Sequence, residues 1–108
     1  LAAEVSAQGG ASVEVVSNRA PIAPTVMYDA FADQIAAAAE DHAPEGWMRM
    51  PSAAGHDPMV LSHRLPCAML FIPSINGISH DFAEDSKDED IVLGCQVLAD
   101  AAQGILRN

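Results

Sequence analysis

Residues 66–73 read PCAMLFIP, and this short apolar run between two prolines decides the fold. Six consecutive apolar residues are too few for a typical buried helix, but they suit a β-strand that is covered on both faces. Around this run the chain alternates in the order helix, strand, helix, strand, short helix, buried strand, loop and helix. That order predicts an α/β fold in which helices pack on a sheet.

On the N-terminal side, the sequence predicts the end of a helix over residues 1–8 and a strand with one solvated face over residues 11–17. Residues 18–24 contain two prolines and no periodicity, so we expect a connection there. Thr25 is expected to cap a helix that ends near His42, before Pro44 and Gly46.

Two further helices and an extended run are expected after that helix. Residues 47–50 are expected to be extended, and Asp57, as an N-cap before a proline, is expected to begin a short helix that continues to residue 64. The last helix is expected over about residues 87–107, where its acidic start and basic end suit the helix dipole. Helical spacing predicts that its buried face consists of Ile91, Cys95, Leu98, Ala102 and Ile105.

The composition excludes some classes of partner. Five basic residues against fifteen acidic ones give a formal net charge of -10, which argues against binding to nucleic acid or to an anionic membrane surface. No stretch approaches the roughly 20 apolar residues of a membrane span. Two cysteines, Cys67 and Cys95, in an otherwise ordinary composition suggest the reducing cytoplasm, while a disulfide between them stays open.

Two loops place a histidine among small residues, over residues 52–58 and 73–80. The second loop follows the predicted buried strand, and ligands of α/β sheets gather at the carboxyl ends of strands. His80 is therefore a candidate metal ligand, because neutral imidazole binds Zn²⁺ and neighbouring divalent metals. A single histidine does not make a catalytic zinc site, which typically has three protein ligands.

The two loops together resemble a known family. PSAAGHD at residues 51–57, MLFIPS at 69–74 and GISH at 77–80, with Glu84 four residues further on, resemble the C-terminal signature of the hydantoinase/carbamoylase amidases. These belong to the M20 group of metallopeptidase-like enzymes, with N-carbamoyl-L-amino acid hydrolases, allantoate amidohydrolases and β-ureidopropionases among them. The chain departs from the usual motif at Ala53, at Pro58 and after His80, which bears on the substrate.

The resemblance implies a role for four residues. His80 would be one ligand of a centre of two divalent ions (Zn, Mn, Ni or Co), and His56 with Gly55 would help to hold the substrate. Glu84 would either support the metal ligand or simply fix its loop. The family's other metal ligands, its catalytic glutamate and its carboxylate-gripping residues have no counterpart here.

The resemblance also implies the architecture and the reaction. Residues 1–20 would be the tail of a lid and dimerisation domain, and residues 21–108 would be the C-terminal part of a Zn-exopeptidase-like catalytic domain. The chain begins with Leu1, so we expect a segment of a longer homodimeric hydrolase acting on C–N bonds of N-carbamoyl or ureido compounds. Two alternatives stay open: a non-catalytic binding or assembly module, and a fragment of an M20 peptidase or deacylase.

Overall fold

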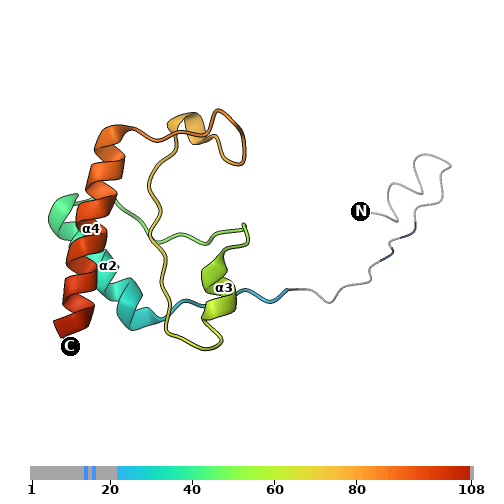
Figure 1. Cartoon of the computed structure of the whole chain (residues 1–108), viewed down its shortest axis with the longest axis horizontal. Helices are drawn as coiled ribbons and strands as arrows, with labels where there is room; N and C mark the ends of the chain where they lie inside the picture. The colour runs from blue at the N-terminus through green and yellow to red at the C-terminus, as the bar shows by residue number, and fades with distance from the viewer. Residues whose placement is uncertain (1–13, 15, 17–21, 108) are drawn as a thin grey trace.

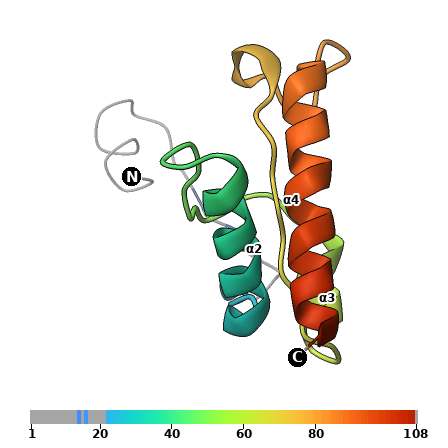
Figure 2. The same cartoon turned by 90° about the vertical axis from the view of Figure 1, so that its left-hand side faces the viewer.

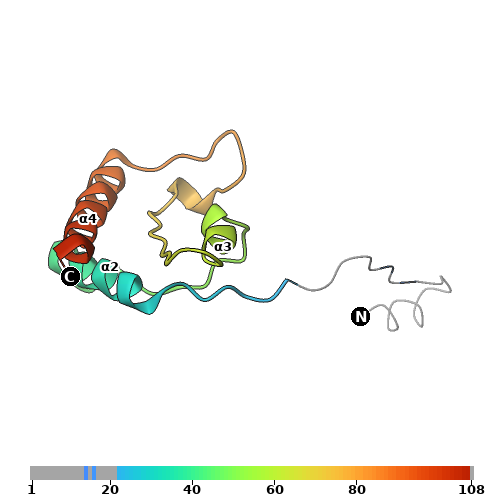
Figure 3. The same cartoon turned by 60° about the horizontal axis from the view of Figure 1, so that its bottom comes forward.

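The computed structural model describes residues 14, 16 and 22–107, and Figure 1 shows how they are arranged. Two helices, α2 (Asp29–His42) and α4 (Asp88–Arg107), lie against each other and form one wall of the molecule (Figure 2). A short helix α3 (Asp57–Leu61) and a single 3₁₀ turn η1 (Ile75–Gly77) lie on the other side (Figure 3). The predicted helix over residues 1–8, most of the strand over 11–17 and the domain boundary at residue 20 lie outside the described residues.

Helix α2 begins three residues later than the sequence predicted. Thr25 does not cap it; Tyr28 precedes its first residue, and the backbone N–H of Tyr28 donates to the carbonyl oxygen of Cys67 at 2.8 Å. This hydrogen bond ties the chain before α2 to the start of the apolar run, so the residues before Asp29 stay out of the helix. The end of α2 at His42 is as predicted.

The core lies where α2 meets α4. Among the described residues, the buried hydrophobic side chains are Ala38, Ala39, Val97 and Ala101. Ile35, Leu70 and Leu93 are partly buried against them, so the helices and the apolar run share one small core. Small side chains let the two helix backbones approach closely, which explains why an alanine-rich helix can pack without large residues.

The buried face of α4 differs from the predicted one by about one residue, or roughly 100° around the helix. Cys95 and Ala102 are exposed, and Leu98 is 54% exposed, whereas Val97 and Ala101 are buried. The reason is that α4 carries apolar residues nearly all round, which makes its hydrophobic period ambiguous. The side with Gly94, Ala101 and Gly104 permits the closest contact, and that side faces α2 and the apolar run.

The apolar run follows α4 as an extended segment without regular secondary structure (Figure 2). Within the described part of the chain no residue is in a β-strand, and residues 68–72 form no backbone hydrogen bond. The predicted packing of helices on a sheet is therefore not seen in residues 22–107. Helix α3, expected to continue to residue 64, is a regular helix only to Leu61, after which the chain makes turns.

None of the helices in the described residues combines the length and the apolar character needed to cross a membrane. Cys67 and Cys95 are both free thiols, so the question of their pairing is answered in this structure.

Candidate functional site

The first histidine loop, residues 51–58, holds His56 by side-chain contacts. The Oγ atom of Ser52 lies 2.9 Å from Nε2 of His56, four residues further along the chain. The backbone N–H of Ala54 donates to the same Oγ atom at 3.3 Å. The loop is therefore closed on itself through one hydroxyl group.

A second contact fixes the face of the His56 ring. The ring centroid of Phe71, from the apolar run, lies 5.2 Å from that of His56, and the two planes are inclined at 60°. His56 also precedes the first residue of α3, and its backbone N–H points to Sδ of Met59 at 3.4 Å. Asp57 was expected to be the N-cap, but it is the first residue of α3. Its carboxylate lies in the first turn, where it interacts favourably with the positive end of the helix dipole.

Gly55, His56 and Phe71 line an open groove of about 1240 Å³. The other walls of the groove are the apolar run, residues 45–54 and the facing sides of α2 and α4. Most of this lining is apolar, and Ser52 and His56 are among its few polar side chains, which is the usual composition of a site for a small organic ligand.

The second histidine loop lies between residues 73 and 86, and its two ends are held together. The backbone N–H of Ile75 donates to the carbonyl oxygen of Asp85 at 2.7 Å, and the Ser86 hydroxyl donates to the carbonyl oxygen of Pro73 at 2.9 Å. Asn76 and Gly77 turn the chain with positive φ values of 57° and 68°. The loop is thus a closed turn at the end of the apolar run, as the Asn-Gly signal predicted.

His80 is at the tip of this loop in a left-handed backbone conformation, with φ = 59°. Such a conformation is uncommon for a residue other than glycine, although histidine tolerates it better than most. The carboxylate of Glu84 accepts the backbone N–H of His80 at 2.6 Å and stabilises this conformation. The Ser79 hydroxyl lies 2.8 Å from Nδ1 of His80, which leaves Nε2 as the ring nitrogen without a partner among the described residues.

The structure places these predicted site residues on two loops on the same side of the molecule, away from α2 and α4 (Figures 1 and 3). Gly55 and His56 share the groove, but His80 and Glu84 do not line it. His80 is exposed rather than packed in the interior. In residues 22–107 no group of three or more His, Cys, Asp or Glu side chains could hold a metal ion, so a metal site at His80 would require ligands from elsewhere.

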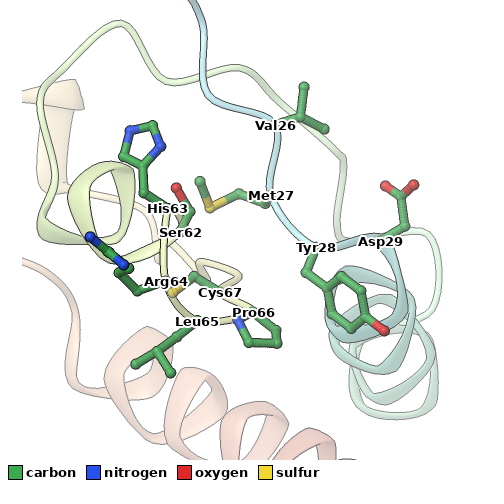
Figure 4. A pocket seen from close by; sticks show the side chains of 10 residues that line it. All are labelled: Val26, Met27, Tyr28, Asp29, Ser62, His63, Arg64, Leu65, Pro66 and Cys67. Carbon is green, nitrogen blue, oxygen red and sulfur yellow. The ribbon is translucent and has the colours of Figure 1, made fainter.

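A smaller hollow of about 500 Å³ adjoins the groove and shares Val26, Met27 and Asp29 with it. Figure 4 shows the residues around it, which come from the approach to α2 and from the turn after α3. His63 and Arg64 contribute the basic groups and Asp29 an acidic one. None of the residues predicted to bind substrate or metal lines it, so we do not assign it to the same site.

Sequence reasoning missed the contributions of Ser52, Phe71 and Ser79. The four-residue spacing of Ser52 and His56 within a loop of small residues is a signal that the two side chains can meet. The adjacency of Ser79 to His80 is a similar local signal. The contact between Phe71 and His56 joins residues fifteen positions apart, and no local pattern indicates it.

Comparison with known proteins adds evidence from sequence and structure. Residues 6–104 match the sequence profile of peptidase family M20/M25/M40. The chain is 50% identical to an allantoate amidohydrolase of Escherichia coli (strain K12) over 50 residues, which are 46% of this chain and 12% of that protein. It is 42% identical to an N-carbamoyl-L-amino acid amidohydrolase of Geobacillus stearothermophilus over 55 residues, or 51% of this chain and 13% of that protein.

A solved structure agrees with these sequence matches. The crystal structure of an amidase of the hydantoinase/carbamoylase family from Burkholderia phymatum superimposes with a TM-score of 0.67 at 42% sequence identity. The match covers 75% of this chain and 18% of that chain, so the 108 residues correspond to a minor part of such an enzyme. The M20 profile across nearly the whole chain, together with this structural likeness, shows that the chain belongs to the peptidase M20/M25/M40 family.

Proposed function

We propose that the chain is the C-terminal part of the catalytic domain of a two-metal amidohydrolase, referred to below as the parent enzyme. The parent enzyme would be a cytoplasmic homodimer that hydrolyses C–N bonds of N-carbamoyl amino acids or of ureido compounds such as allantoate. The observation that carries this proposal is the 50% identity to an allantoate amidohydrolase. The N-carbamoyl-L-amino acid amidohydrolase and the hydantoinase/carbamoylase amidase support the same class of substrate.

His80 is the residue of this chain that would bind a metal. Its ring is exposed on a closed loop, and its Nε2 atom has no partner among the described residues. That nitrogen is therefore available to bind a metal ion. Zn, Mn, Ni or Co would suit an imidazole nitrogen. The other ligands would come from parts of the parent enzyme outside these 108 residues.

In the proposed reaction, the metal ions and the residues of this chain would have different tasks. A bound pair of divalent ions supplies Lewis acidity, which polarises a carbonyl group and lowers the pKa of a bound water. His56 and Gly55 would hold the substrate at the groove, where the imidazole can donate or accept a hydrogen bond. This chain therefore contributes one ligand and a substrate contact, and the proton-transfer carboxylate would come from elsewhere in the parent enzyme.

We propose that the extended apolar run, residues 68–72, joins a β-sheet in the parent enzyme. Residues 68–72 have free backbone N–H and C=O groups within the described part, and such groups are normally paired when they become buried. Pairing with strands from the rest of the catalytic domain would satisfy these groups and produce the α/β layer that the sequence predicted.

The substrate class is tested by comparing the parent enzyme with the isolated chain. We expect the parent enzyme to release product from N-carbamoyl amino acids or allantoate and to be much slower on N-acyl amino acids. The purified 108-residue chain should show no turnover above background, because it supplies a single metal ligand. Preference for N-acyl substrates would identify a deacylase instead, and turnover by the isolated chain would contradict the assignment of a single ligand.

Replacing Glu84 with alanine should weaken metal binding without removing a ligand. The carboxylate holds the backbone of His80 in its left-handed conformation, so its loss lets the imidazole move away from the metal. We expect a reduction in metal affinity of about 10- to 100-fold, the usual effect of losing a group that orients a ligand. Titration of the metal-free parent enzyme measures this, with Asp85→Ala, a neighbouring carboxylate that does not contact His80, as the control. Unchanged affinity in Glu84→Ala would show that Glu84 does not support the ligand.

A further inference from the structure

The orientation of the His56 imidazole is determined by two residues to which no role has been given so far. Ser52 contacts Nε2 of the ring at 2.9 Å, and Phe71 contacts the ring itself at a centroid distance of 5.2 Å. The two contacts come from different segments, one from the loop and one from the apolar run. The contact with Ser52 fixes the position of the ring edge that carries Nε2, and the contact with Phe71 limits rotation of the ring.

The hydrogen bonds around Ser52 hold one edge of the His56 ring in place. The Oγ atom of Ser52 accepts from the backbone N–H of Ala54, which fixes its position in the loop. A hydroxyl has one donor and two acceptor positions, so Oγ can donate to Nε2 of His56 or accept from it. The contact therefore orients the imidazole in either tautomer.

We propose that Ser52 and Phe71 are positioning residues that hold the His56 ring with its edge at the groove. The imidazole then offers a hydrogen-bonding group of fixed direction, suited to a polar group of the substrate. This inference rests on the proposed amidohydrolase function for its effect on substrate binding, but the ring orientation does not depend on that function.

Ser52 does not fit the role of a nucleophile despite its contact with a histidine. A serine nucleophile requires a histidine that is itself oriented by a third group, normally a carboxylate. Within the described residues no carboxylate contacts His56, whose recorded contacts are Ser52, Phe71 and Met59. The geometry therefore supports an orienting contact and not activation of the hydroxyl.

Kinetics of the parent enzyme test the proposed effect on substrate binding. Ser52→Ala should raise KM about tenfold, the approximate value of one hydrogen bond that orients a polar group, with a smaller change in kcat. Ser52→Thr, which keeps the hydroxyl, should restore most of the affinity, and Phe71→Leu should raise KM by a similar factor. Ser62→Ala, a serine on the end of α3 that does not contact His56, is the matched control and should stay within about twofold of the wild type.

A double-mutant comparison separates positioning from general stability. In the background of His56→Ala, the change Ser52→Ala should have no further effect on KM, because the group it positions is already absent. Additive losses, or failure of threonine to restore KM, would overturn the proposal.

The ring itself is observed by ¹⁵N NMR of the histidine side chains in the parent enzyme. We expect the ratio of the two His56 tautomers to differ between the wild type and Ser52→Ala, because the hydroxyl contacts only Nε2. The same ratio in both proteins would overturn the proposal whatever the substrate is. If the tautomer changes as expected but ureido compounds are not hydrolysed, the proposed function fails while the role of Ser52 stands.

Discussion

Replacing His80 with alanine in the parent enzyme is expected to remove bound metal and to lower kcat by more than about 100-fold. Loss of a group that merely orients a metal ligand lowers metal affinity or activity by about 10- to 100-fold. Loss of the ligand itself should lower them further. This expectation rests on three features of His80: it is exposed, its Nε2 atom has no partner among the described residues, and Glu84 holds its backbone in an uncommon conformation.

Metal analysis and steady-state kinetics of the purified variant measure the effect of His80→Ala. His63→Ala is the matched control, because His63 is an exposed histidine outside the groove and the His80 loop. His56→Ala should instead raise KM while leaving the metal content unchanged. Full metal content in His80→Ala would remove His80 from the metal centre, even if activity were lost.

Replacing Gly94 with alanine should destabilise the chain, although alanine favours helices more than glycine does. A Cβ atom at this position would lie 2.5 Å from Cγ2 of Ile72, well inside van der Waals contact. Ile72 is β-branched, so its Cγ2 atom can move away only through a change of χ1, which is restricted in such residues. We expect a loss of about 1–3 kcal/mol from overpacking, offset in part by a gain of about 1 kcal/mol in helix propensity.

Thermal or chemical unfolding of the 108-residue chain and of the parent enzyme measures the effect of Gly94→Ala. Gln96→Ala, at an exposed position on the same helix, should change the free energy of unfolding by less than about 0.5 kcal/mol. Adding Ile72→Ala to Gly94→Ala should cost less than the sum of the two single changes, because it removes the colliding atom. A stabilised Gly94→Ala protein would show that α4 and the apolar run do not approach this closely.

The positions of the helices could be predicted because their signals are local. The acidic first turn of α4 and the Asp57-Pro58 pair at α3 act on the neighbouring backbone, and both helices begin within one residue or two of the expected position. The predicted start of α2 was wrong by three residues because a hydrogen bond to Cys67, thirty-nine positions away, holds Tyr28 outside the helix. No pattern near Thr25 reports that contact.

For the candidate site, too, local motifs could be predicted from the sequence, whereas contacts between side chains could not. The motifs around Gly55, His56 and His80 identified the residues and the family from sequence, and the family membership is confirmed. The roles of His80 as metal ligand and of His56 as substrate contact stay predictions. Their hydrogen-bond partners, Ser52 and Ser79, became visible only when the loops were folded.

The sequence by itself determined the family, the positions of most helices and the two loops that carry histidine, because each of these depends on residues close together in the chain. Only the tertiary structure decided which side of α4 is buried and how His56 is held. Helix α4 has apolar residues around most of its circumference, so its buried side depends on where Ile72 and α2 lie and not on its own periodicity. The orientation of His56 depends in the same way on Phe71, a residue from another segment.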